Sequence, residues 1–145
     1  MSDLVELMKV ALADTYAFGL KAQNYHWNVT GPNFSDYHAF FGEFYTTVWG
    51  SVDLYAEHAR TLDTFVPGSL SRFSELTRIQ DETSIPSAQQ MFSRLYADNE
   101  IMINQLNIAH NLANSLNKRG IVNFLEGQID YHEKMHWMLK SFTNS

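Results

Sequence analysis

Residues 24–57 read NYHWNVTGPNFSDYHAFFGEFYTTVWGSVDLYAE, and this stretch decides how the rest of the chain is interpreted. It holds two of the 6 histidines, His26 and His38, and two carboxylates four residues apart, Asp53 and Glu57. Imidazole and carboxylate groups are good ligands for transition-metal ions. The four side chains are therefore candidate ligands, and their spacing determines which of them can share an ion.

A long helix is predicted from about residue 36 to residue 62. Apolar side chains recur there at steps of three or four, the period of one helix face, and no Gly-Pro pair interrupts them. His38 and Asp53 are then roughly 22 Å apart along the helix axis, at about 1.5 Å per residue. One chain therefore cannot bring these two side chains to one ion.

The turn before this helix should bring the two histidines together. Gly31-Pro32 ends the preceding helix, predicted over about residues 3–27 with Ser2 as its cap. Asn33 and Asp36 have the spacing of an N-cap and its partner in the first turn. A short reversal places the end of one helix beside the start of the next, so the two histidines fall at a similar level.

Two antiparallel copies of the long helix would bring the histidines and the acids together. If a two-fold axis passes near residues 45–47, each end of the pair carries both histidines of one chain and both acids of the other. Asp53 and Glu57 are four residues apart on a helix, so they face the same way. The spacing thus predicts two identical intersubunit sites, provided that these residues bind metal.

The run NYHWNVTGPNF, the following His38 and the segment DLYAE at residues 53–57 resemble the signature of Dps proteins, the dodecameric miniferritins of bacteria. The segments HEK at residues 132–134 and WML at residues 137–139 are also similar to the family, so the resemblance extends over nearly the whole chain.

The resemblance implies an activity and a partner. His26 and His38 of one subunit, with Asp53 and Glu57 of its two-fold mate, would form a ferroxidase centre. The implied reaction oxidises Fe(II) with hydrogen peroxide or oxygen, and ferric iron is stored in a hollow shell of twelve subunits. Zinc is a candidate competitor for iron at this site, and the sequence leaves open whether it competes.

One position departs from the family pattern. Dps proteins usually carry an aspartate one helical turn after the second histidine, where it binds the second iron directly or through water, and this chain has Gly42 there. Glu43 is adjacent but points about 100° away around the helix. A non-catalytic shell with a weakened metal site, acting as a structural or nucleoid-associated protein, therefore remains the alternative.

The rest of the chain completes an all-α fold. Residues 63–85 form a connection longer than the usual helix–helix loop, with a short helical piece around Phe73 and Leu76. The sequence therefore predicts a single domain over residues 1–145, a ferritin-like four-helix bundle with one long crossover.

The third and fourth helices have recognisable ends. The third should begin near Ser87, with Gln90 completing a capping box, and should end at residues 117–120 with Gly120 in the terminal left-handed position. The fourth is expected over about residues 121–142.

The segment HEKMH at residues 132–136 fits the H-E-x-x-H pattern of zinc peptidases. Such a site takes a third ligand from further along the chain, and residues 137–145 contain no ligand-quality side chain. We interpret the match as coincidence and expect His132 to be a packed or interface histidine. A di-iron site inside one bundle fits poorly, because it needs two Glu-x-x-His motifs and the chain has one.

The composition restricts the expected types of metal site, the binding partners and the cellular location of the protein. The chain lacks cysteine, which excludes disulfides and thiolate metal sites. Its net charge is -6 and no lysine-rich arm precedes the first helix, so DNA binding is not expected, because non-specific DNA affinity needs clustered Lys and Arg. We see no signal-peptide pattern and no apolar run of membrane-spanning length, which favours a cytoplasmic protein without a membrane anchor.

Overall fold

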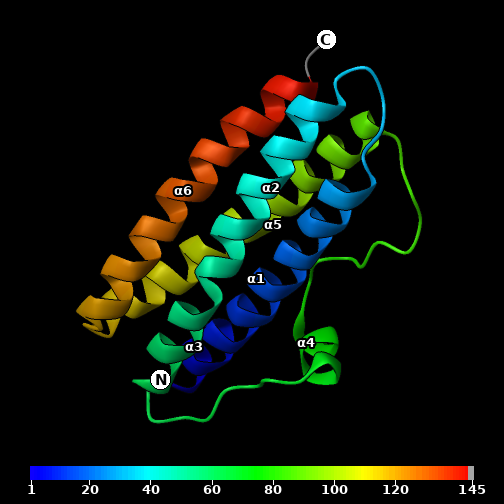
Figure 1. The fold of residues 1–145 in the computed structure, drawn as a ribbon. Coiled ribbons are helices and arrows are strands. Elements are labelled where there is room, and N and C mark those ends of the chain that lie inside the picture. The colour runs from blue at the N-terminus through cyan, green and yellow to red at the C-terminus, as the bar shows by residue number, and fades with distance from the viewer. Residues whose placement is uncertain (144–145) are drawn as a thin grey trace.

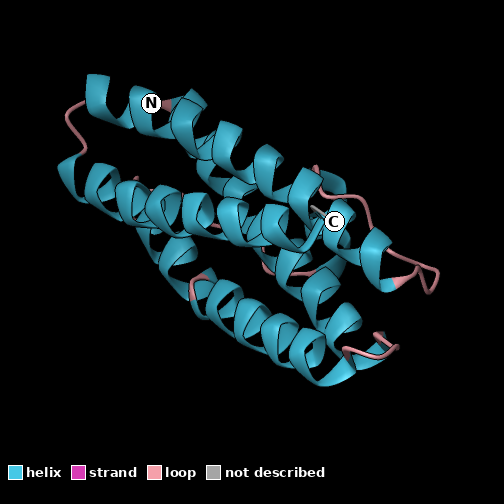
Figure 2. Ribbon diagram, turned by 90° about the horizontal axis from the view of Figure 1, so that it is seen from above, coloured by secondary structure: helices cyan, strands magenta, loops and turns pink. Residues whose placement is uncertain are grey.

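The computed structural model describes residues 1–143 as helices and loops; residues 144 and 145, the last two of the predicted 1–145 domain, lie outside the described part. The long helices lie side by side, and Figure 1 shows the short helix Leu70–Leu76 (α4) beside them within the crossover. Viewed from above, the long helices run along the bundle and loops join their ends (Figure 2). The predicted all-α bundle with one long crossover is confirmed. The helices are α1 (Ser2–Asn28), α2 (Phe34–Gly50), α3 (Val52–Arg60), α4 (Leu70–Leu76), α5 (Ala88–Ser115) and α6 (Arg119–Thr143).

The core consists of two apolar clusters along the bundle. One contains Phe18, Phe41 and Phe92, and the other contains Leu4 and Tyr55. All five side chains are buried, because each helix turns one apolar face inward at the helical period. In the part of the chain that the structure describes, none of the helices is both long enough and apolar enough to span a membrane.

The long helix predicted over residues 36–62 is interrupted once, at Ser51. Ser51 keeps right-handed helical backbone angles, φ -89° and ψ -12°, so α2 and α3 continue as one rod. Its backbone N–H and its hydroxyl both donate to the Val48 carbonyl, at 3.1 and 2.6 Å. The prediction of an uninterrupted helix was wrong at this residue, because a serine side chain competes for the carbonyls that the regular helix uses.

The helix ends also differ in detail from the prediction. Met1, not Ser2, caps α1, because the Met1 carbonyl already accepts the first helical hydrogen bond, from the Val5 N–H at 3.0 Å. Asn33 does cap α2, but its side chain makes no capping hydrogen bond. The capping box of Ser87 and Gln90 at the start of α5 is confirmed.

The end of α5 corrects the role predicted for Gly120. Asn117 occupies the left-handed position, with φ 57°, and Gly120 lies inside α6. The Lys118 N–H donates to the Ala113 carbonyl at 3.0 Å, which closes a Schellman turn around Asn117. Asparagine tolerates this conformation better than other residues with a Cβ, so the helix can end before the glycine.

The crossover, residues 61–87, is attached to the bundle by a buried ion pair. Lys21 Nζ of α1 lies 2.9 Å from Asp98 Oδ2 of α5, and their side chains are only 7% and 9% exposed. Lys21 also donates to the Gln80 carbonyl of the crossover at 2.8 Å. Burial raises the pKa of Asp98, although Lys21 acts in the opposite direction. One lysine thus joins α1, α5 and the crossover.

Candidate metal centre

The side chains of His26 and His38, the His pair, are held together where α1 ends and α2 begins. His26 Nδ1 lies 2.7 Å from the His38 carbonyl oxygen, and His38 Nδ1 lies 2.7 Å from the His26 carbonyl oxygen. The two rings are stacked, with centroids 3.8 Å apart and an interplanar angle of 14°. The short reversal between α1 and α2 therefore makes the two histidines neighbours, as the turn geometry predicts.

The reciprocal hydrogen bonds fix the protons of both rings. A carbonyl oxygen can only accept a hydrogen bond, so each Nδ1 must carry a proton. In the neutral imidazole the other nitrogen, Nε2, then has a free lone pair. Metal-binding histidines are commonly oriented in this way, with one ring nitrogen donating to a carbonyl and the other binding the ion. The His pair thus offers two oriented nitrogen donors.

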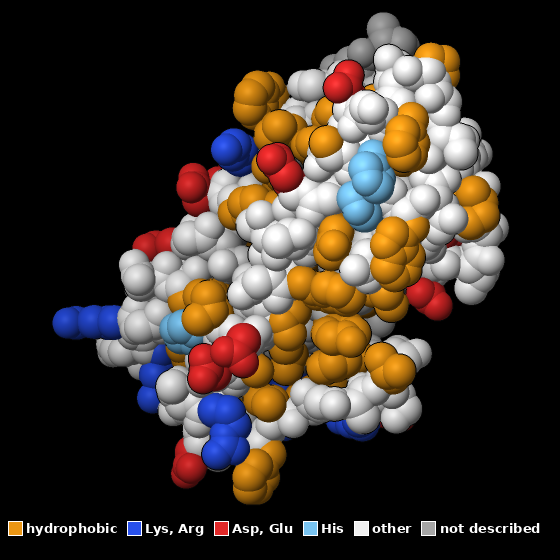
Figure 3. Space-filling model, in the orientation of Figure 1, with side chains coloured by type: hydrophobic (Ala, Val, Ile, Leu, Met, Phe, Trp, Pro, Cys, Tyr) orange, Lys and Arg blue, Asp and Glu red, His pale blue; other side chains and the backbone are white. Residues whose placement is uncertain are grey.

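Aromatic side chains surround the His pair. Phe34 stacks on the His38 ring with centroids 5.0 Å apart, and Tyr45 lies 5.3 Å from the His26 ring. Trp27, which follows His26, is 62% exposed. Figure 3 shows histidine side chains at the surface beside hydrophobic ones on the face that it displays. The candidate donors therefore have aromatic side chains as neighbours, beside a surface hollow that Glu43 and Thr46 also line.

Asp53 and Glu57, the acid pair, lie on α3 and are exposed to solvent. They are roughly 22 Å along the α2–α3 rod from the start of α2, where His38 lies. Among residues 1–143, no three His, Asp or Glu side chains are grouped closely enough to hold one ion. The structure thus brings the His pair together but not the acid pair with it, and their meeting across a two-fold axis stays a prediction.

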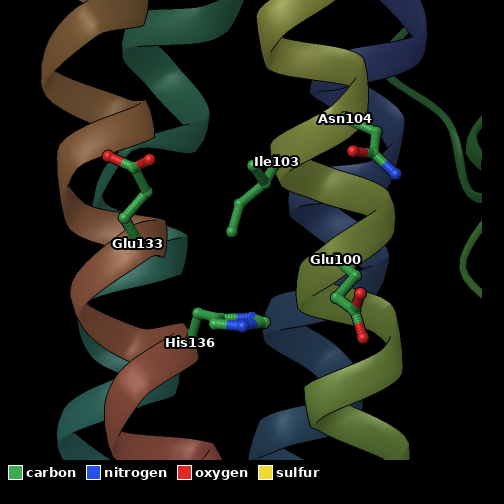
Figure 4. A pocket seen from close by; sticks show the side chains of 5 residues that line it. All are labelled: Glu100, Ile103, Asn104, Glu133 and His136. Carbon is green, nitrogen blue, oxygen red and sulfur yellow. The ribbon is translucent and has the colours of Figure 1, made fainter.

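The HEKMH segment does not form a metal site in the described chain. His132 is 1% exposed, and its Nδ1 lies 2.7 Å from Asn99 Oδ1, while His136 Nε2 lies 3.1 Å from the Tyr96 hydroxyl. His136 borders a cavity of about 290 Å³ between α5 and α6. Figure 4 shows that the carboxylate of Glu133 does not converge on the His136 ring. The interpretation of His132 as a packed histidine agrees with its burial.

Burial of His132 predicts a pH-dependent stability. Burial lowers the pKa of His132 from its ordinary 6.5 to about 4, so the unfolded chain takes up a proton at a higher pH than the folded one. The free energy of unfolding therefore has its full value above about pH 6.5, where His132 is neutral in both states. It should decrease by about 3 kcal/mol as the pH falls to 4. Urea unfolding at pH 7 and pH 4 should show this loss in the natural protein.

The matched variant is His132→Gln, which keeps a polar side chain but does not titrate. Its free energy of unfolding should fall less between pH 7 and pH 4, by about the same 3 kcal/mol. Equal pH dependence in the two proteins would show that His132 does not cause the effect.

Sequence reasoning missed the groups that hold the His pair in place. The orienting acceptors are backbone carbonyls, which no side-chain motif reveals. It also missed the close approach between the α2 backbone at Gly42 and the His26 ring. The sequence signal that could have indicated this contact is the spacing of Gly42, which follows His38 by four residues and so lies on the same helix face.

Comparisons with known proteins agree over nearly the full chain. The family model described as ferritin-like domain matches residues 5–145. A protein of Nostoc sp. named "uncharacterized low temperature-induced protein" is 33% identical over 141 residues, covering 96% of this chain and 79% of the relative. The "DNA protection during starvation protein" of Brevibacillus brevis is 29% identical, covering 94% of this chain and 91% of the relative.

Solved structures of Dps proteins also match the fold of this chain over nearly its full length. A Dps protein from Bacillus brevis has a TM-score of 0.93 at 28% identity, covering 97% of this chain and 95% of that one. Dps from Staphylococcus aureus has a TM-score of 0.95 at 27% identity, covering 100% and 97%. A Dps protein from Vibrio cholerae O1, at 26% identity, TM-score 0.93 and coverages of 97% and 89%, is described as a member of a broad superfamily of ferritin-like diiron-carboxylate proteins.

Proposed function

Because this chain belongs to the Dps family of ferritin-like proteins, we propose that it is a miniferritin that oxidises Fe(II) and stores ferric iron. The oxidant is hydrogen peroxide or oxygen. The site lies between subunits, with His26 and His38 of one chain and Asp53 and Glu57 of its two-fold mate. The pairs assemble into a hollow shell of twelve subunits.

The observation that carries the proposal is the locked orientation of the His pair. Both Nδ1 atoms are 2.7 Å from backbone carbonyls, which leaves both Nε2 atoms free for an ion. Imidazole and carboxylate together suit iron, and the carboxylates favour the harder Fe(III) product. Zinc prefers the same nitrogen and oxygen donors, so it should compete for the site.

The proposed pairing also accounts for exposed apolar side chains on the helices of the site. Trp27, Phe34 and Leu54 are 62%, 41% and 44% exposed. Phe34 begins α2 and Leu54 lies next to Asp53 in α3, so both flank proposed ligands. Exposed apolar groups on a surface that carries functional residues are typical of a protein interface. A second copy packed against the α2–α3 rod would cover such groups and supply the missing carboxylates.

The chemistry needs donors that hold iron through a change of charge. Two Fe(II) ions give one electron each to hydrogen peroxide, which takes up two protons and leaves as two waters. The imidazoles bind Fe(II) as neutral donors, and the acids of the mate stabilise the added positive charge on Fe(III). The product then moves into the shell as ferric mineral.

Peroxide-driven Fe(II) oxidation tests the proposed function. The natural protein should oxidise Fe(II) well above the rate in buffer, and His38→Ala should fall to the buffer rate, because one of the two oriented nitrogen donors is lost. His110→Ala is the matched control, since His110 Nε2 pairs with Glu126 at 2.9 Å, outside the His pair. Absorbance of the ferric product measures the rate.

Two results would contradict the proposal. The first is a natural protein that oxidises iron no faster than buffer, and the second is a His38→Ala variant with unchanged activity. An inactive protein that retards DNA tightly at low salt, with steep loss at higher salt, would instead favour the nucleoid-associated shell.

A further inference from the structure

The first residue of α2 places an aromatic ring on a candidate metal ligand. Phe34 and His38 are four residues apart in α2, so their side chains lie on the same face of the helix. The Phe34 N–H donates to the Gly31 carbonyl at 3.1 Å, which holds Phe34 at the turn between α1 and α2. The Phe34 and His38 rings are stacked, with centroids 5.0 Å apart and an interplanar angle of 21°.

The His38 ring therefore lies between two aromatic planes. Its other stacked neighbour is the His26 ring, with centroids 3.8 Å apart and an interplanar angle of 14°. Two parallel rings cannot share one face of an imidazole at these distances, because their atoms would overlap. Phe34 and His26 thus cover opposite faces of His38. Tyr45 meets the His26 ring at a tilt of 44°, so the flat packing on both faces is particular to His38.

This packing matters because the torsion that turns a histidine ring is weakly restrained. The χ2 torsion joins an sp³ carbon to an sp² carbon, and such torsions have broad preferences. The hydrogen bond from His38 Nδ1 to the His26 carbonyl, at 2.7 Å, holds one atom of the ring. Carbonyl oxygens accept hydrogen bonds over a broad range of directions, so this bond alone permits the ring to tilt. A ring between two parallel planes cannot tilt.

The direction of the free nitrogen depends on that tilt. A metal ion binds an imidazole in the plane of the ring, along the lone pair of Nε2. Productive sites hold their ligands within about 10 to 20° of the required geometry, by packing as well as by hydrogen bonds. Rotation of the His38 ring away from the His26 ring would turn the Nε2 lone pair out of that range. The Phe34 ring occupies the space that this rotation needs.

We propose that Phe34 is a positioning residue for His38, whose Nε2 it holds in the direction that the shared ion requires. The inference rests on the proposed function, because it concerns the same site. Phe34 supplies no ligand atom and acts through the His38 ring. Its side chain is 41% exposed and lies outside the two core clusters, so the bundle should fold without it.

Zinc binding by Phe34→Leu tests the positioning role. Leucine keeps an apolar side chain at the proposed subunit contact but has no planar ring. The affinity of the metal-free assembled protein for zinc, measured by calorimetry, should fall about 3- to 10-fold, the effect of losing one stacked aromatic pair. Phe34→Tyr keeps the ring and should bind zinc as tightly as the natural protein does.

Two further measurements distinguish positioning from a general structural effect. Sedimentation should show the same assembly for the natural protein and both variants. A crystal structure of Phe34→Leu should show an angle between the His26 and His38 rings well above the present 14°. Phe65→Leu is the matched control, because Phe65 is 83% exposed and its ring lies 4.9 Å from Arg60 Cζ in the crossover region.

Three results would overturn the positioning role while leaving the proposed function intact. They are unchanged zinc affinity in Phe34→Leu, an equal loss of affinity in Phe34→Tyr, and a loss that accompanies a smaller assembly, since Phe34 would then act through the subunit contact alone. His38→Ala tests the proposed function separately. If zinc binding and iron oxidation are both unchanged in His38→Ala, the proposed function fails, and the inference fails with it.

Discussion

Two inactive variants of this protein should recover Fe(II) oxidation when their subunits assemble together. His38→Ala removes a nitrogen donor, and the double variant Asp53→Ala/Glu57→Ala removes the acid pair. A mixed dimer contains one site in which both histidines and both acids are intact, and one site in which both sets are damaged. With equal expression, half of the dimers are mixed, so about a quarter of the natural activity should return. Co-expression of the two variants, followed by the peroxide assay, measures the recovered activity.

The control for this experiment combines two variants that are both substituted in the His pair. Mixed dimers of His26→Ala and His38→Ala contain a damaged His pair at both sites, so no activity should return. Recovery in this control, or none in the first mixture, would contradict a site shared between two chains. A site within one chain predicts that neither mixture recovers.

Lys21→Met should destabilise the folded chain by about 3–5 kcal/mol, because it leaves Asp98 buried without its partner. Lys21 Nζ is 2.9 Å from Asp98 Oδ2, and both side chains are less than a tenth exposed. The variant also loses the hydrogen bond from Lys21 to the Gln80 carbonyl of the crossover. Guanidinium unfolding monitored by helical circular dichroism measures the change.

The double variant Lys21→Met/Asp98→Leu is the matched control. Replacing both buried charges by apolar side chains of similar size is often neutral or stabilising, so much of the lost stability should return. If the single variant loses less than about 1 kcal/mol, as exposed ion pairs do, the pair does not secure the crossover.

The helices were predictable because their signal repeats along the sequence. Each bundle helix carries many apolar residues at the helical period, so errors at single positions do not change the prediction. The interruption at Ser51 and the left-handed Asn117 depend on single hydrogen bonds and single backbone angles. Such local features have no repeated signal, and the predicted helix ends were accordingly less accurate than the helices themselves.

The site was predictable only in part, for a different reason. The turn after residue 28 places His26 beside His38, and the length of the α2–α3 rod separates them from Asp53 and Glu57. The carbonyl acceptors and the contact at Gly42 arise from three-dimensional packing and leave no motif. A single chain cannot show how its two ends pair with those of a second copy.

A crystal structure of the zinc-soaked protein tests the shared site most directly. The shared site predicts zinc bound by Nε2 of His26 and of His38, with carboxylate oxygens of Asp53 and Glu57 from the two-fold mate at about 2.0–2.2 Å. Zinc held by the His pair and water alone, with the acid pair of every neighbouring subunit far away, would contradict it.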